Sequence, residues 1–500
     1  MKKQALLAAL AAMIGTGSLA QTGITKLDMN IGSGPSYPIH IIPFGAGVAC
    51  YATNGSRGWE LHTTDGTSAP VMVADLNPLA GSAVGQFFNR PVAVIQSKLY
   101  FTGDNGASGY ELFKYTGTGS PTITDIEIGT GSSSPDNFVV LNNVLYFRAS
   151  SSTEGYELWS YDPNVTTPIR LTDIRTGIDS SVTGNIIPFN NKIYFTADDN
   201  GNNNELWEYN PTIQIAQIVD NINASGSSNP MHLTVLNNKL YFSADDGING
   251  RELYVYDGIS APTRLTDVGT GSFDGMPDTK APLITYFNNK LYFIGMNTNA
   301  DKQIYVYDAG TGNATVAAST NGANSSEPSW LTLYNGKIYF AAYNDTKGIE
   351  LWSFDGTNTP KLEIELCTGT NSSNPQQLTP VGDNLYFRAI DCGGVGEELF
   401  RYNFKEVSVS NLSFNGKATL FPNPATTTAT LQLQLNKAEN ILVSITDMQG
   451  RTVYTTGIQN MPAGETNVAL PTARLQPGIY NCSVTSSTGS KYYSTQLVVK

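Results

Sequence analysis

Short segments in which apolar and polar side chains alternate recur along most of the chain, separated by turns rich in Gly, Asn and Asp. Four of them follow one another at 231–236 (MHLTVL), 239–244 (KLYFSA), 251–257 (RELYVYD) and 262–268 (PTRLTDV). Alternation with a period of two is typical of β-strands, and the Asn-Asn and Asp-Gly pairs between these segments favour tight turns because they tolerate positive φ. The pattern therefore predicts a four-stranded antiparallel unit.

This unit repeats along the chain, with an aromatic second strand (KLYF, KIYF, LYFR or NLYF) and a glutamate in the third strand every 46 to 51 residues. The glutamate column is Glu60, Glu111, Glu157, Glu205, Glu252, Glu350 and Glu398, and Gln303 takes the sixth place. Eight units of this length with four strands each are typical of a β-propeller. The eighth unit ends after its third strand, but the N-terminal stretch 23–38 (GITKLDMNIGSGPSYP) repeats the fourth strand and following link of other units. The sequence therefore predicts an all-β chain, with an eight-bladed propeller over 21–404 closed by an N-terminal strand.

A second acidic column lies just before the Gly- and Ser-rich link that would cross from one blade to the next. It comprises Asp28, Asp75, Asp125, Asp173, Asp220, Asp267 and Glu365, with Ala318 as the exception. Because a buried carboxylate is costly unless it is hydrogen-bonded, we expect both columns to accept backbone N–H groups and fix the crossover links. The alternative is a ring of calcium or catalytic sites, which we favour less because a propeller seldom needs eight identical sites.

Calcium has only a weak sequence signal. The acidic turns at 198–205 and 245–252 resemble metal-binding loops, but neither has the ligand order of a calcium loop. We therefore predict no metal site and no cofactor.

One position at the start of the predicted inner strands varies from unit to unit while staying polar or aromatic. The column reads His40, Asn137, Asn185, His232, Trp330 and Gln377. Units two and six instead carry about four extra residues around 87–90 and 279–282. Because inner strands line the central channel, the hypothesis is a ligand site at the channel mouth; the alternative is a solvated surface that varies freely.

The formal net charge is −13, so the chain would repel nucleic acids. Residues 1–20 have the two lysines, short apolar segment and small-residue cleavage site of a signal peptide. No later apolar run is long enough to span a membrane, so we expect an exported, soluble protein. Export permits disulfides, and Cys367 and Cys392 could pair, whereas Cys50 replaces a core aromatic and should be buried.

Catalytic signals are few, since the chain has three histidines and none of the common hydrolase or metalloprotease motifs. Two classes of function remain open. The first is a binding or adhesion module for a glycan or protein ligand, presented on the face of the crossovers. The second is a secreted polysaccharide-active enzyme, a glycosidase or lyase with carboxylates outside the repeated columns.

The sequence ELHTTDGT at 60–67, followed by VMVADLNP at 71–78, resembles the ELWxxDGT repeat family. Units three, five and seven keep most of the motif, as ELWSYDP, ELYVYDG and ELWSFDGT. The resemblance implies an exported repeat protein and supplies no catalytic residues.

The repeat ends before residue 417, and a linker at 405–416 precedes a segment, 417–500, whose alternation predicts a small β-sandwich. Its FPNP sequence at 421–424, the turn from Asp447 to Gly450, the GIY at 478–480 and the final Lys500 resemble the C-terminal sorting domain of type IX (Por) secretion. The resemblance implies passage through the periplasm and translocation by the type IX machinery. It also implies that the tail is removed, with the cargo released or attached to surface lipopolysaccharide.

Overall fold

The computed structural model of the chain describes residues 23–30, 34–78, 81–84, 89–165, 167–279, 281–394, 396–403, 418–435, 438–447, 452–486 and 491–500. The chain divides into two units, residues 1–407 and 408–500, and each has hydrophobic clusters of its own. The predicted signal peptide and linker lie outside the described residues, as do Phe87 in the extra segment of unit two and Gly450 of the predicted turn.

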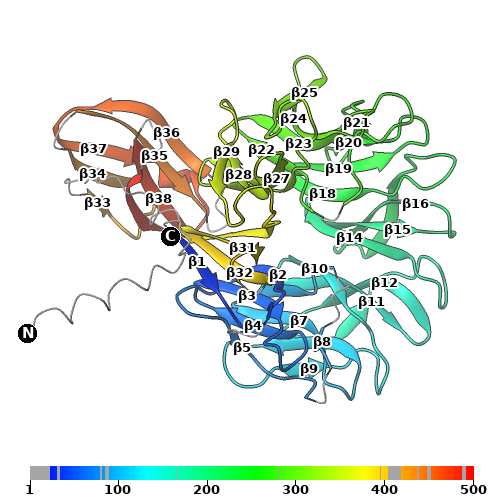
Figure 1. The fold of residues 1–500 in the computed structure, drawn as a ribbon. Coiled ribbons are helices and arrows are strands. Elements are labelled where there is room, and N and C mark those ends of the chain that lie inside the picture. Colours follow the sequence, from blue (N-terminus) through cyan, green and yellow to red (C-terminus); the bar gives the residue numbers. More distant parts are fainter. Residues whose placement is uncertain are drawn as a thin grey trace, which may run out of the picture. The chain divides into compact units, whose positions relative to one another are not determined.

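The described strands of the first unit form eight four-stranded antiparallel sheets, each of which corresponds to one sequence unit (Figure 1). Sheets one to four are β2 (Ile39–Phe44), β3 (Gly47–Ala52), β4 (Glu60–Thr64) and β5 (Val71–Met72); β6 (Val92–Ile95), β7 (Lys98–Asp104), β8 (Tyr110–Tyr115) and β9 (Thr122–Thr124); β10 (Asp136–Leu141), β11 (Val144–Ser151), β12 (Glu154–Tyr161) and β13 (Pro168–Arg170); and β14 (Val182–Phe189), β15 (Lys192–Asp198), β16 (Asn204–Asn210) and β17 (Ile215–Asp220).

Sheets five to eight follow the same order. They are β18 (Met231–Leu236), β19 (Lys239–Asp245), β20 (Arg251–Tyr256) and β21 (Thr263–Arg264); β22 (Ile284–Phe287), β23 (Lys290–Met296), β24 (Lys302–Asp308) and β25 (Asn313–Ala318); β26 (Ser329–Tyr334), β27 (Lys337–Asn344), β28 (Gly348–Phe354) and β29 (Lys361–Ile364); and β30 (Gln376–Val381), β31 (Asn384–Asp391), β32 (Gly396–Asn403) and β1 (Ile24–Leu27).

The N-terminal strand completes the eighth sheet, as the sequence predicts. β1 pairs antiparallel with β32, so that Ile24 lies opposite Tyr402 and Leu27 opposite Leu399. The first strands of the sheets contact one another in the order β2, β6, β10, β14, β18, β22, β26 and β30, and β30 in turn contacts β2. The all-β, propeller-type fold is therefore confirmed. Eight blades in a closed ring stay a prediction, which this sheet order and these contacts support.

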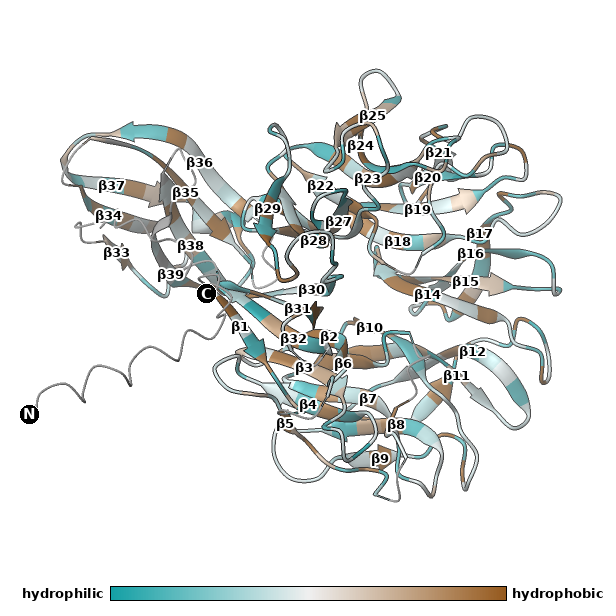
Figure 2. Ribbon diagram, in the orientation of Figure 1, coloured by the Kyte–Doolittle hydropathy of each residue, from teal (hydrophilic) through white to brown (hydrophobic). Residues whose placement is uncertain are grey.

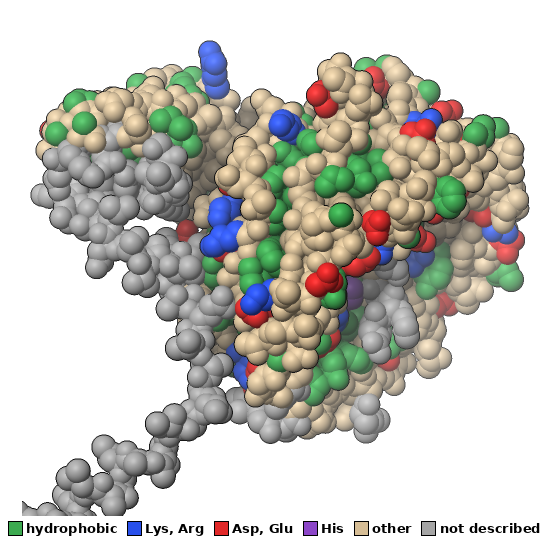
Figure 3. Space-filling view, turned by 45° about the horizontal axis from the view of Figure 1, so that its top comes forward, with side chains coloured by type: hydrophobic (Ala, Val, Ile, Leu, Met, Phe, Trp, Pro, Cys, Tyr) green, Lys and Arg blue, Asp and Glu red, His purple; other side chains and the backbone are tan. Residues whose placement is uncertain are grey.

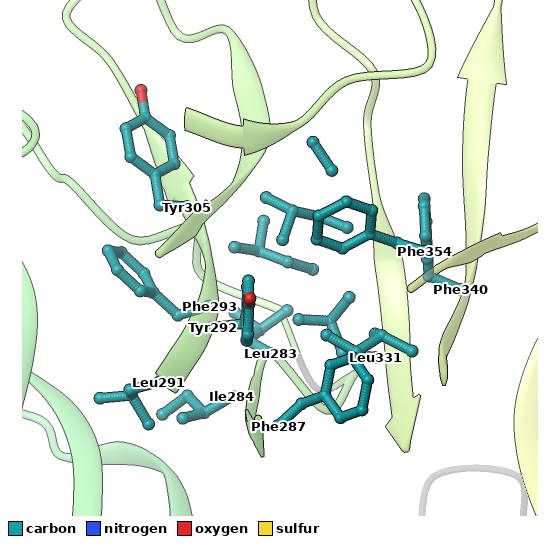
Figure 4. Packing of buried hydrophobic residues seen from close by; sticks show 14 of the residues in the cluster. Leu283, Ile284, Phe287, Leu291, Tyr292, Phe293, Tyr305, Leu331, Phe340 and Phe354 are labelled. Atoms are coloured by element: carbon teal, nitrogen blue, oxygen red, sulfur yellow. The ribbon is translucent and has the colours of Figure 1, made fainter. Parts of the chain in front are cut away.

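The repeated aromatic strand is buried because neighbouring sheets pack on both of its faces. In sheet six, Phe293 stacks on Tyr305 with ring centroids 5.7 Å apart, while Tyr292, on the other face of β23, meets Phe354 of sheet seven edge-on at 5.9 Å (Figure 4). Strands of this unit carry both hydrophobic and hydrophilic stretches (Figure 2). Packing of this kind explains the recurrence of aromatic side chains without any ligand.

The second unit consists of two sheets that share one hydrophobic core. One sheet has the order β33 (Ala418–Phe421), β34 (Ala429–Leu435) and β37 (Gly464–Leu470), and the other has the order β36 (Thr452–Met461), β35 (Glu439–Thr446), β38 (Gly478–Ser486) and β39 (Lys491–Val499), with a 3-10 turn η1 at Thr472–Arg474. The core combines Leu431 and Leu433 with Ile441, Cys482 and Leu497. This is the small β-sandwich that the alternation predicts. In the described part of the chain, no helix has the length and apolar character needed to cross a membrane.

Candidate ligand-binding pocket

The six residues of the variable column share one backbone conformation. Their φ angles lie between 51° and 61° for His40, Asn137, Asn185, His232, Trp330 and Gln377. In each of these six sheets the pairing of the first and second strands shifts at this point, which marks a β-bulge. The first strands of sheets two and six pair with no such shift. The extra residues of units two and six therefore accompany the loss of the bulge.

Several side chains of this column join neighbouring sheets. Asn185 Nδ2 donates to Pro230 O of the next unit at 3.3 Å, and Gln377 Oε1 accepts the backbone N–H of Ile41 at 3.0 Å. Trp330 packs against two hydrophobic clusters, one reaching into unit six and the other into unit eight. Burial, with a smaller effect of Arg388, lowers the pKa of His40 to about 4, so its ring is neutral at pH 7. Asn185, Gln377 and Trp330 therefore help to join neighbouring blades.

A polar pocket of about 470 Å³ lies along the starts of the inner strands of units three to five. Its lining comprises Asn89, Asn137, Asn185, Asn204, Asn229, Thr183, Thr196, Asp136, Asp278, Arg148, Arg251, Gly184, Pro230 and Met231. Near the middle of the face shown in Figure 3, acidic and basic side chains and a histidine lie close together. The pocket thus brings together Asn137 and Asn185 of the predicted column, whereas the other four members do not line it.

Of the two segments that break the repeat, one lines this pocket and the other directly follows a lining residue. Asn89 belongs to the extra residues of unit two, and its Nδ2 donates to Asn137 Oδ1 at 2.9 Å. Asp278 precedes the extra residues of unit six, where Thr279 O lies 2.5 Å from His232 Nε2. The breaks in the repeat and the polar column therefore meet at one place.

Arg148 and Asp136 form an ion pair in the pocket, so their charges compensate each other. Arg148 Nε and Nη2 donate to the two oxygens of Asp136, each at 2.8 Å. Asp136 also accepts from Asn137 Nδ2 at 3.0 Å and from the backbone N–H of Asn89 at 3.4 Å. The guanidinium lies 4.4 Å from the ring centroid of Tyr156. These contacts fix the pair, and they occupy the carboxylate of Asp136.

A second network fixes Arg251 and His232. Arg251 Nη1 donates to Asn229 O at 2.7 Å and to Ser243 Oγ at 3.3 Å. Ser243 Oγ lies 2.9 Å from His232 Nδ1. Because a carbonyl only accepts, His232 Nε2 carries the proton toward Thr279 O, and Nδ1 accepts from the serine. Burial lowers the pKa of His232 to about 4 despite the bond to Thr279, so the ring is neutral at pH 7.

Sequence reasoning missed most of the pocket residues, among them Arg251, Asn204, Asn229 and Asp278. One signal was present for Arg251, because it occupies the place before the repeated glutamate, where the other units hold Trp59, Tyr110, Tyr156, Asn204, Lys302, Ile349 and Glu397. Among the eight units, unit five has the arginine at this place.

The glutamate column makes the backbone contacts that its structural interpretation requires. All seven glutamates are buried. Glu350, for example, accepts backbone N–H groups from Leu366, Cys367 and Ser373, each within 3.2 Å. Burial raises the pKa of every member, and to about 7 for Glu60, Glu350 and Glu398.

A column of buried serines completes this contact and was missed in the sequence. The hydroxyls of Ser36, Ser133, Ser181, Ser228 and Ser373 each donate to the glutamate of their blade contact, and Ser326 donates to Gln303. In unit five Gly275 takes this place because a side chain there would collide with Glu252. The available signal was a recurrent Ser-x-Pro at 36–38, 133–135, 228–230, 326–328 and 373–375.

The second acidic column follows the expectation only in part. Asp28, Asp125 and Glu365 do accept the backbone N–H groups of Asn30, Gly129 and Gly369. However, Asp75, Asp173, Asp267 and Glu365 form ion pairs with Arg57, Arg170, Arg264 and Lys347. Because this column lies nearer the surface, solvent competes for its hydrogen bonds and long basic side chains can reach it.

The predicted pairing of Cys367 with Cys392 is present as a disulfide, with the Cα atoms 5.2 Å apart. Cys50 is buried, as predicted for a residue that replaces a core aromatic, and it forms no disulfide. No group of three or more His, Cys, Asp or Glu side chains is placed to hold a metal ion in the described ranges.

Comparison with known proteins bears mainly on the second unit. Residues 419–500 match the family model of the secretion system C-terminal sorting domain. The chain is therefore an exported protein, handled by the type IX machinery and destined for the cell surface or the extracellular space. No curated protein matches the chain in sequence.

Several solved structures resemble it at low identity. PorZ, a surface component of the type IX secretion system of Porphyromonas gingivalis, is 15% identical, with 90% of this chain and 64% of PorZ covered and a TM-score of 0.41. A puromycin hydrolase is 13% identical (73% and 60% covered, TM-score 0.43), and a prolyl endopeptidase is 9% identical (83% and 55% covered, TM-score 0.44). The chain spans less than two thirds of the length of each of these proteins. At such values the similarity carries no argument about function.

Proposed function

We propose that the first unit is a ligand-binding module of a cell-surface or secreted protein, and that its ligand, a glycan or a protein, occupies the polar pocket of units three to five. One observation carries this proposal. Five asparagine and two threonine side chains line a single pocket of about 470 Å³, at the place where both breaks in the repeat meet. This volume lies within the usual range of small-molecule sites, and convergent polar groups can fix the orientation of a bound ligand.

The geometry favours binding over catalysis. Two carboxylates outside the repeated columns, Asp136 and Asp278, line the pocket, and this favours a glycosidase or lyase as the second candidate. However, Asp136 is held by both arms of Arg148 and by two further donors, so it has no free oxygen with which to move a proton. A single remaining carboxylate does not supply the acid–base pair of a glycosidase.

The finer sequence interpretations belong to the same proposal. We assign the signal peptide to 1–20, the propeller to 21–404, the linker to 405–416 and the sorting domain to 417–500. We also propose that the eight units are repeats of the ELWxxDGT type. After export by the type IX machinery, the propeller would present its pocket either at the outer-membrane surface or in the medium.

The test uses glycan and protein arrays with the exported chain, together with a hydrolysis screen of the same glycans. Asn229→Gly is the pocket variant, and Asn374→Gly is its matched control. Both asparagines stand in a Ser-Asn-Pro sequence with φ of 46° and 47°, a conformation that glycine tolerates, but only Asn229 lines the pocket. The proposal expects Asn229→Gly to weaken ligand binding and Asn374→Gly to leave it unchanged. Turnover of a glycan that is lost in Asp278→Asn would favour the enzyme instead.

A further inference from the structure

Among the arginines of the described residues, Arg251 is the one that is buried, with 8% of its surface exposed, and it lines the pocket. No carboxylate of the described residues forms an ion pair with it, in contrast to Arg148 in the same pocket. A buried charge without an ion-pair partner is costly, and the cost falls when an opposite charge binds beside it.

The remaining donors of Arg251 are available to a ligand. Both hydrogen bonds of its guanidinium to described residues use Nη1, so Nε and Nη2 have no acceptor among those residues. Together these two nitrogens form a fork that matches the two oxygens of a carboxylate. The bonds of Nη1 to Asn229 O and Ser243 Oγ fix the plane of this fork before a ligand arrives.

The rest of the lining is suited to hydroxyl groups. Asn185 Oδ1 has no hydrogen-bond partner among the described residues and can accept from a hydroxyl. Asn204 and Asn229 bond to each other, Nδ2 to Oδ1 at 3.0 Å, and add further amide groups to the wall. Among the described residues of the lining, Met231 and Pro230 are the apolar side chains and most of the others are polar, which suits hydroxyl groups better than a hydrophobic peptide side chain.

We infer that the pocket of units three to five recognises an acidic saccharide, whose carboxylate binds the free fork of Arg251 and whose hydroxyls bind the surrounding asparagines. This inference rests on the proposed binding function and names its ligand class. Asp278 places a negative charge in the same pocket and would repel an acidic ligand. It is exposed and has no ion pair with a described residue, so it weakens acidic ligands without abolishing their binding.

The experiment titrates the purified chain with oligogalacturonate, sialyllactose and heparosan-type glucuronate oligosaccharides, each beside its methyl ester. A bidentate bond to a charged group predicts that esterification weakens binding about tenfold or more. Arg251→Gln should weaken binding of the acid to a similar extent and leave the ester within about twofold. Asp278→Asn should change affinity in the opposite direction, strengthening the acid by about two- to fivefold.

A thermal unfolding curve of each variant shows whether the substitution has disturbed folding. Arg251→Lys separates the effect of the charge from that of the fork. The lysine keeps the charge but not the fork, so it should recover part of the affinity for the acid. The comparison of acid with ester in the unchanged chain needs no substitution at all, so the inference stays testable if Arg251→Gln does not fold.

The possible failures are distinguishable. If acid and ester bind equally and Arg251→Gln has no effect, the acidic ligand is ruled out while the binding function stands. If peptides bind through a free C-terminal carboxylate and the uronates do not, the saccharide class is wrong. If neither acidic nor neutral saccharides nor peptides bind at millimolar concentration, both the inference and the proposed function fall.

Discussion

Ser373 Oγ donates a hydrogen bond of 2.5 Å to Glu350 Oε2 across 23 residues of sequence, and Ser326 Oγ makes the same bond to Gln303 Oε1 in the preceding unit. The two pairs occupy equivalent buried places in successive units, with a carboxyl group in the first pair and an amide in the second. The chain therefore contains its own comparison for what the charge of this position contributes.

The first prediction concerns pH. The pKa of Glu350 is raised to about 7 in the folded chain by burial. Because a raised folded pKa means that the folded state binds the proton more tightly, the stabilisation is complete below about pH 4.5 and is lost as the pH rises through 7. Glu350→Gln does not titrate. Its free energy of unfolding relative to the natural chain should therefore rise by about 1–3 kcal/mol between pH 4.5 and 8, measured by denaturant unfolding at each pH.

The histidines have lowered pKa values and therefore stabilise the folded state as the pH rises, opposite to Glu350. Because they are present in both chains, their contribution cancels in the difference of unfolding free energies. Gln303→Glu serves as the reciprocal variant and should acquire the pH dependence. If the difference between the two chains instead falls as the pH rises, the four donors around Glu350 hold it ionised and burial does not dominate its pKa.

The second prediction concerns the serine column. Ser373→Ala removes the hydroxyl from a buried glutamate and should lower the free energy of unfolding by about 1–3 kcal/mol. The fold should survive, because Ala83 occupies the same place beside Glu60 in unit one and the backbone N–H of Ala83 still bonds to Glu60. Urea unfolding of Ser373→Ala and of the exposed control Ser68→Ala measures the difference. Equal urea midpoints for the two variants would show that the hydrogen bond from Ser373 to Glu350 does not stabilise the folded chain.

The third prediction concerns the N-terminal strand. Deletion of residues 21–31 removes β1 and exposes the edge of β32, which should cause a large loss of stability or aggregation. Leu27→Ala is a milder test, since Leu27 is buried against Leu399 and Ile41, and should cost about 2–4 kcal/mol. Thermal unfolding compares both with Lys239→Ala, a substitution at an exposed strand position. An unchanged melting curve for the deletion would show that the ring closes in another way.

The fourth prediction concerns the tail. The two units have separate cores, so deletion of 417–500 should leave the first unit folded. Export past the periplasm should be lost, because the sorting domain is removed with the tail. Circular dichroism of the purified truncation and cell fractionation check the two halves of the prediction. Normal surface delivery of the truncated chain would contradict the role given to the tail.

Much of the fold could be predicted from the sequence because each unit carries its own local instructions. The alternation of apolar and polar residues set the four strands, and the Asn-Asn and Asp-Gly pairs set the turns between them. The orphan copy at 23–38 indicated how the eighth sheet is completed, since a missing strand and a spare one match in pattern. Glu350 and its equivalents were recognisable for the same reason, because a contact made in every blade recurs at a fixed spacing.

The candidate site was decided only by the tertiary structure. Asn89 and Asp278 come from units two and six and share no pattern, yet they line one pocket because the inner strands of the units between them lie side by side. The sequence does not distinguish Arg148 from Arg251. Packing places the carboxylate of Asp136 against Nε and Nη2 of Arg148, whereas the guanidinium of Arg251 donates to Asn229 O and forms no ion pair with a described carboxylate. Repeats fix what each blade is, since that depends on neighbours along the chain; the chemistry of a site depends on neighbours in space, where each blade differs.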